Sequence, residues 1–212
     1  GFSDLDTPSH FESESVSMRF IEAELDYAGQ RISLRENLPF NEQNTLYFER
    51  RNRPDGQSRV FYLLSHCLLV LAQREGVTSQ ARFFDVFWDK DKEIAQAISV
   101  NLSLTPDDIS PDFAQLILQK TIALYMSGID FGLILEHKAI FKLIDTLAKK
   151  KDYAAPTIID IDELYNKTLN TLIFEEKDKA FNSVFSAEYV VPESQKEILL
   201  EWIALFEKLP SL

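Results

Sequence analysis

The side chains best suited to chemistry are an arginine and a histidine in one predicted helix. Arg59 and His66 are seven residues apart in a segment predicted to be helical from Ser58 to about Glu75. Two helical turns separate them, so both side chains should lie on the same helix face. A guanidinium can hold a phosphate or carboxylate while an imidazole exchanges a proton, and Arg53 lies close enough in sequence to contribute a second guanidinium. A hydrolase or nuclease centred on this pair is therefore one hypothesis.

The spacing of this pair also carries a family resemblance. An arginine, six intervening residues and a histidine resemble the signature of HEPN-type helical ribonucleases, and the resemblance implies RNA cleavage, usually across a dimer in that family. It covers two residues and departs at Val60, where the family usually has a polar residue. His66 also lies among Leu64, Cys67 and Leu68, a setting that favours a hydrogen-bonded histidine in the core.

Other motifs of catalysis and metal binding are missing from the sequence. The three histidines, His10, His66 and His137, include no pair at i and i+4, and no Gly-rich phosphate loop, nucleophile elbow or HExxH motif occurs. A single cysteine, Cys67, excludes an intramolecular disulfide and a cysteine-based zinc cluster, and its apolar setting predicts a buried, inert thiol. The sequence therefore predicts no cofactor and favours a role other than catalysis.

Three groups of acidic residues, within 89–93, 107–112 and 160–163, could suggest a metal site. None has the alternating acids, central glycine and terminal glutamate of a calcium loop. The first is interleaved with lysine, and the other two occur where helix caps and first-turn acids belong. We therefore predict no metal site.

The charge balance limits the classes of partner. The chain has 212 residues, with 34 Asp plus Glu against 22 Lys plus Arg, and a formal net charge of −12. Most of the affinity for nucleic acid comes from cationic contacts with phosphates, so general nucleic-acid binding is excluded. The excess of acid keeps a protein soluble and also suits a basic protein partner.

Two clusters of residues are candidate binding sites. An arginine-rich segment before the first helix could hold an anion or carboxylate, and an aromatic cluster exceeds what one side of a short helix can bury. The predicted binding residues are Arg50, Arg51, Arg53, Phe83, Phe84, Phe87 and Trp88.

The hydrophobic pattern predicts a mainly α protein, a single helical bundle-like domain with a small N-terminal β-hairpin or three-stranded element. We expect a mobile acidic arm over residues 1–15, the β-containing element over 16–56 and the helical domain over 57–212. Helices are expected over 58–75, in two pieces within 78–98, over 110–127, around 140–147, over 161–173 and from about 192 to 209.

Alternating apolar residues predict a hairpin in the first element. Val16, Met18 and Phe20 alternate with polar residues, the alternation continues in the opposite phase from Ile21, and residues 28–30 supply a turn. The change of phase suggests a β-bulge, and residues 45–49 suggest a third strand. An amphipathic helix over 12–27 is the alternative.

The longest apolar stretch, residues 60–72, is shorter than the roughly 18 residues that a membrane-spanning helix needs. With one cysteine and no targeting segment, a cytoplasmic location is expected.

The main hypothesis is an acidic protein–protein interaction module, such as an adaptor, an accessory subunit or an inhibitor of a basic protein. The oligomeric state does not follow from the sequence.

Overall fold

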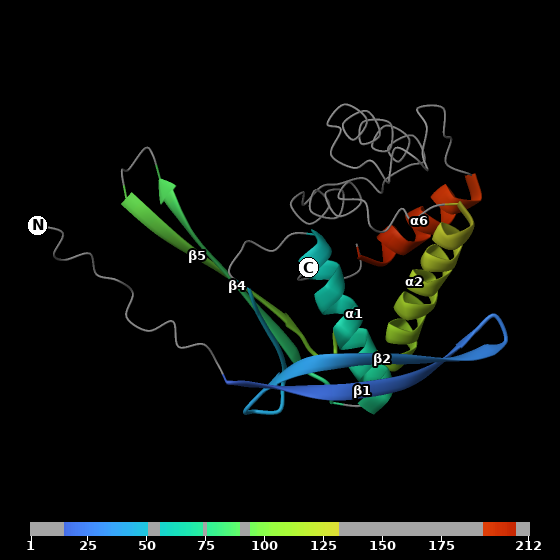
Figure 1. The fold of residues 1–212 in the computed structure, drawn as a ribbon, viewed down its shortest axis with the longest axis horizontal. Coiled ribbons are helices and arrows are strands. Elements are labelled where there is room, and N and C mark those ends of the chain that lie inside the picture. The colour runs from blue at the N-terminus through green and yellow to red at the C-terminus, as the bar shows by residue number, and fades with distance from the viewer. Residues whose placement is uncertain (1–14, 51–55, 74–75, 90–93, 132–192, 207–212) are drawn as a thin grey trace, which may run out of the picture.

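A five-stranded mixed sheet and three helices form the fold in the computed structural model, which describes residues 15–50, 56–73, 76–89, 94–131 and 193–206 (Figure 1). The prediction of a mainly α helical bundle is therefore wrong. The elements in chain order are β1 (Val16–Tyr27), β2 (Gln30–Asn41), β3 (Leu46–Arg50), α1 (Gly56–Gln73), β4 (Ser79–Asp89), β5 (Ile94–Leu104), α2 (Pro111–Phe131) and α6 (Glu193–Phe206).

The strands lie in the sheet in chain order, from β1 at one edge to β5 at the other. Every neighbouring pair is antiparallel except β3 and β4, which are parallel. A parallel connection needs a crossover, and α1 supplies it. Figure 1 shows the β1–β2 hairpin on one side of α1 and α2, whereas the far end of the β4–β5 hairpin reaches away from the helices. The strands that precede α1 in the chain and the strands that follow it therefore belong to the same sheet.

The sequence analysis failed over residues 79–104, where it expected two helical pieces and the structure has the β4–β5 hairpin. The spacing of the aromatic residues there matches a helix face as well as a strand. However, phenylalanine, valine and tryptophan favour strands, and Ala81, Phe83, Leu102 and Leu104 are buried at alternate positions, the period of a strand. The tertiary pairing with β3 confirms the strand assignment for β4.

The hairpin predicted within residues 16–49 is confirmed, and the alternative helix over 12–27 is wrong for its described part. Ala28 and Gly29 form its two-residue turn, and their φ angles of 50° and 77° are those of a type I′ turn. The predicted bulge is absent, because each residue from Val16 to Tyr27 pairs with one residue of β2. The change of phase instead separates an exposed apolar outer face near Val16 from a buried inner face that includes Ala23.

The core surrounds α1, which is buried on nearly every side. Tyr62, Leu63, Cys67 and Leu69 are almost completely buried, as the uninterrupted apolar run predicts for a central helix. Side chains from the inner faces of β1 and β2, from β4 and β5, and from α2 and α6 complete the same cluster. This helix therefore joins the sheet to the other two helices.

The second and last helices begin and pack as their sequences suggest. Ser110 caps α2, since its Oγ accepts a hydrogen bond from Phe113 N at 3.2 Å, and Pro111 is the first helical residue. On α6, Trp202 is fully buried and its Nε1 donates to Thr121 Oγ1 of α2 at 2.8 Å. The predicted helices at 140–147 and 161–173, and the arm up to residue 14, lie outside the described residues.

Candidate functional site

His66, the centre of the enzymatic hypothesis, is fully buried within the core. Its Nδ1 lies 2.7 Å from Ser79 Oγ, the Ser79 hydroxyl donates to Tyr62 Oη at 3.0 Å, and Tyr62 Oη donates to the Ser79 carbonyl oxygen at 2.8 Å. This chain of hydrogen bonds ties α1 to β4.

The burial of this pair is opposite to what nucleophile activation needs. A catalytic base and its nucleophile must reach substrate, whereas here neither His66 nor Ser79 has exposed surface. The remaining ring atom, His66 Nε2, is buried with no hydrogen-bond partner among the described residues. Burial lowers the pKa of His66 to about 4, and the nearby Asp108 carboxylate only partly opposes that shift. Arg59 is half-buried on the same helix, and the His66 side chain has no exposed surface.

The single cysteine is also buried. Cys67 has no exposed surface, and burial raises the pKa of its thiol, so it is not a nucleophile at neutral pH. Within the described residues, no group of histidine, cysteine and acidic side chains could hold a metal ion. No described helix has the length and apolarity to span a membrane.

The arginine-rich segment is described only at Arg50, which ends β3, because Arg51 and Arg53 lie outside the described residues. Arg50 is exposed, and its Nη1 donates to Ser58 Oγ in the first turn of α1 at 3.3 Å. Its guanidinium also lies 5.8 Å from the centre of the Phe61 ring. Arg50 therefore connects the end of β3 to the start of α1.

The four predicted aromatic binding residues do not lie on a helix, since all belong to β4. Phe83 is buried in the core and Phe84 is half-buried, because successive strand residues point to opposite faces. The side chains of Phe87 and Trp88 lie outside the described part of the chain. The structure therefore does not bring Phe83 into an exposed aromatic patch.

Within the described residues, a row of exposed apolar side chains lies on the outer face of β1. Val16, Met18 and Phe20 are 49%, 62% and 61% exposed, and they occupy alternate positions of one strand. Alternate residues share a face, so the three side chains form one row, which we call the apolar row. Large apolar side chains grouped in this way are typical of interaction surfaces.

The backbone of these three residues also points away from the sheet. The Asn41 amide N donates to the Thr45 carbonyl, and the Asn41 carbonyl accepts from the Asn44 amide, each at 3.0 Å. Both groups of Asn41 therefore point away from its β1 partner, Val16, and the two form a non-hydrogen-bonded pair. Antiparallel pairs alternate, so the even-numbered residues of β1 direct their N–H and C=O groups to the open edge of the sheet.

A contact at the other end of β1 agrees with this alternation. Asp26 is even-numbered, and its carbonyl oxygen accepts a hydrogen bond from Gln119 Nε2 of α2 at 2.7 Å rather than from β2. The helix thus covers the edge beside the turn. Over residues 16–24, β1 pairs with β2 and with no other described strand. We call this stretch the open edge.

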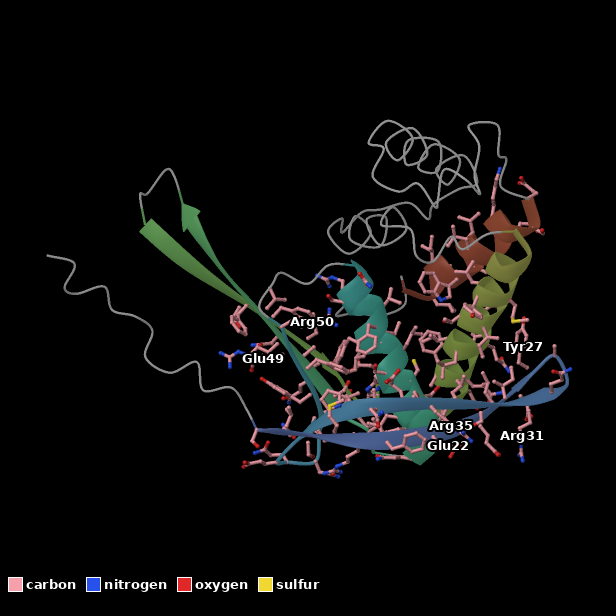
Figure 2. The ribbon with its side chains drawn as sticks, in the orientation of Figure 1. Glu22, Tyr27, Arg31, Arg35, Glu49 and Arg50 are labelled. Atoms are coloured by element: carbon pink, nitrogen blue, oxygen red, sulfur yellow. The ribbon has the colours of Figure 1, made fainter. Side chains whose placement is uncertain are left out.

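The second half of the open edge is acidic. Glu22 Oε1 accepts from Ser33 Oγ at 2.7 Å and from Arg35 Nε at 2.8 Å, and Glu24 Oε2 lies 3.2 Å from Arg31 Nη1. Figure 2 shows Glu22, Arg35 and Arg31 along the hairpin. The hydrogen bonds from Ser33 and Arg35 lower the pKa of Glu22, which keeps its carboxylate ionised at neutral pH.

The sequence analysis used the apolar row only as evidence for a strand. The signal that could have identified it as a surface was the continuation of the same alternation into Glu22 and Glu24, because a strand face that turns acidic is solvated. What the sequence could not show is that β1 lies at an edge of the sheet.

Comparison with known protein families, with curated proteins and with solved structures finds no match.

Proposed function

We propose that this protein is a protein–protein interaction module that binds an extended segment of its partner along the open edge of β1. In strand addition, main-chain hydrogen bonds provide affinity and alternate side chains provide specificity. The buried state of His66 gives no corresponding support to the hydrolase hypothesis.

One observation carries the proposal: the same three residues present both kinds of contact that strand addition uses. Val16, Met18 and Phe20 hold the outward N–H and C=O groups, and their side chains form the exposed apolar row. Proteins usually protect an edge strand with charge, proline or a covering element. Here the Gln119 contact and the acidic residues protect the end of β1 near the turn, and the row is left exposed.

Proline substitutions separate binding from folding. Met18→Pro removes an N–H that points to the open edge, so the pairing with β2 should persist and the fold should be retained. Ser17→Pro is the matched control, because Ser17 is exposed but its N–H points toward β2. We expect this control to lower the stability of the hairpin. Met18→Leu keeps the edge donor and an apolar side chain.

The test is quantitative affinity capture from a lysate with the wild type and the three variants, followed by amide exchange of the recovered complex. We expect partners that are retained by Met18→Leu, lost by a folded Met18→Pro, and able to slow exchange at Val16, Met18 and Phe20. Capture of the same partners by folded Met18→Pro, or unchanged exchange at these amides, would contradict the proposal.

A further inference from the structure

We infer that the segment received by the open edge is basic at one end and apolar at the other. This inference rests on the proposed function and specifies the chemistry of its partner. It follows from the order of side chains on the outer face of β1: Val16, Met18 and Phe20, then Glu22 and Glu24. Residues directly opposite one another in paired strands share a face. The complementary strand therefore has apolar residues opposite the first three and lysine or arginine opposite the two glutamates.

The two carboxylates are already oriented for such a partner. Arg35 contacts Oε1 of Glu22 through both Nε and Nη2, each at 2.8 Å, and Arg31 contacts Oε2 of Glu24. Each carboxylate therefore contacts β2 through one oxygen, and its other oxygen contacts none of the described residues. A carboxylate accepts several hydrogen bonds, so a cation on an added strand can bind it without displacing the arginine.

A second copy of the chain does not complement the whole of this edge. Antiparallel pairing of two β1 strands over the full open edge would place Val16 opposite Glu24 and Met18 opposite Glu22. A register centred on Met18 would align the two apolar rows but would provide no cation for either glutamate. Parallel in-register pairing would place each glutamate beside its counterpart. The formal charge of −12 on each chain adds long-range repulsion between copies, whereas it attracts a basic segment.

The orientation of the added strand is antiparallel, since antiparallel pairing is the more stable per residue. Read from its N-terminus, the complementary segment therefore has its basic residues first. The probe is a capped peptide with two lysines and then three valines at alternate positions, with threonine between them. A control peptide has the same composition in the reverse order, which suits parallel addition.

The experiment measures binding of the fluorescent probe to the full chain by anisotropy. We expect saturable binding that Met18→Pro abolishes and that the double variant Glu22→Gln/Glu24→Gln weakens about fivefold, the size expected for two exposed ion pairs. The control double variant Glu36→Gln/Glu42→Gln makes the same change in net charge at exposed positions outside the outer-face row, and it should bind as the wild type does. Raising the ionic strength should weaken the wild type more than Glu22→Gln/Glu24→Gln.

Each other result counts against this inference. Equal binding of the reversed peptide would overturn the orientation, and equal weakening by both double variants would reduce the effect to net charge. Concentration-dependent dimers in sedimentation, lost in Met18→Pro, would assign the edge to a second copy. If the probe fails to bind while the lysate partners still depend on residue 18, the basic partner is wrong and the proposed function stands. If capture of those partners is also independent of residue 18, the basic partner and the proposed function are both wrong.

Discussion

Protonation of His66 should make the folded state unstable in mild acid. Its imidazole is fully buried, its Nδ1 lies within hydrogen-bond distance of Ser79 Oγ, and its Nε2 has no hydrogen-bond partner among the described residues. Burial lowers the pKa in the folded state to about 4, whereas the unfolded chain keeps the ordinary value of 6.5. Between these values the unfolded state binds more protons, so stability is lost as the pH falls below 6.5 and is restored as it rises.

The size of the effect follows from this difference in pKa. Each unit corresponds to about 1.4 kcal/mol, so complete protonation costs about 3 kcal/mol, of which about 2 kcal/mol is lost between about pH 7 and pH 5. That interval avoids Glu22, whose lowered pKa makes its own contribution fall only below its ordinary value of 4.5. The loss is a large share of the stability of a typical domain.

Urea unfolding at a series of pH values, followed by tryptophan fluorescence, measures this loss. His66→Asn should keep a hydrogen-bonding group near the position of Nδ1 while removing the titration, so its stability should be nearly constant over the interval. Glu22→Gln serves as the control, because it leaves His66 in place and should show the wild-type slope between pH 7 and pH 5. An unchanged slope in His66→Asn would refute the reasoning.

Two further predictions concern elements that position the sheet and the helices. Ala28→Asn should raise the free energy of unfolding by about 0.5 to 1 kcal/mol, because Ala28 has a φ of 50° that asparagine tolerates better. Gly29→Ala, at a φ of 77°, should lower it by a similar amount, and thermal unfolding that ranks the two variants the other way would contradict the turn assignment. Trp202→Phe removes the hydrogen bond to Thr121 and part of a fully buried ring, so we expect a loss of about 1 to 3 kcal/mol in urea unfolding. The exposed Tyr125→Phe on α2 is its control and should change stability little.

Local signals were sufficient for several elements. The caps and apolar runs identified α1, α2 and α6, because each helix has a local start signal such as the Ser110–Pro111 pair or an apolar face with helical spacing. Alternation and the Ala28–Gly29 turn identified the first hairpin. The same rules failed from Ser79 to Leu104, where aromatic spacing fits two periods and the pairing of β4 with β3 decides between them.

The candidate site also has residues whose setting the sequence predicted and residues whose setting it did not. The sequence correctly marked Cys67 as a buried thiol, and it presented a hydrogen-bonded core position as one interpretation of His66. It also placed Phe83 in an exposed patch, because on a helix four neighbouring aromatics cannot all face inward. On a strand, Phe83 and Phe84 point to opposite faces, so Phe83 lies in the core and does not join an exposed patch, whereas the apolar row on β1 is exposed.

The sequence alone determined the acidic charge, the missing catalytic motifs, the first hairpin and the apolar central helix, since composition and short-range periodicity require no knowledge of distant contacts. The tertiary structure decided that the strands form one sheet, that β1 lies at an edge of it and that the His66 imidazole contacts Ser79. Strand order and side-chain hydrogen-bond partners depend on residues far apart in the chain, and no local pattern encodes which of them will meet.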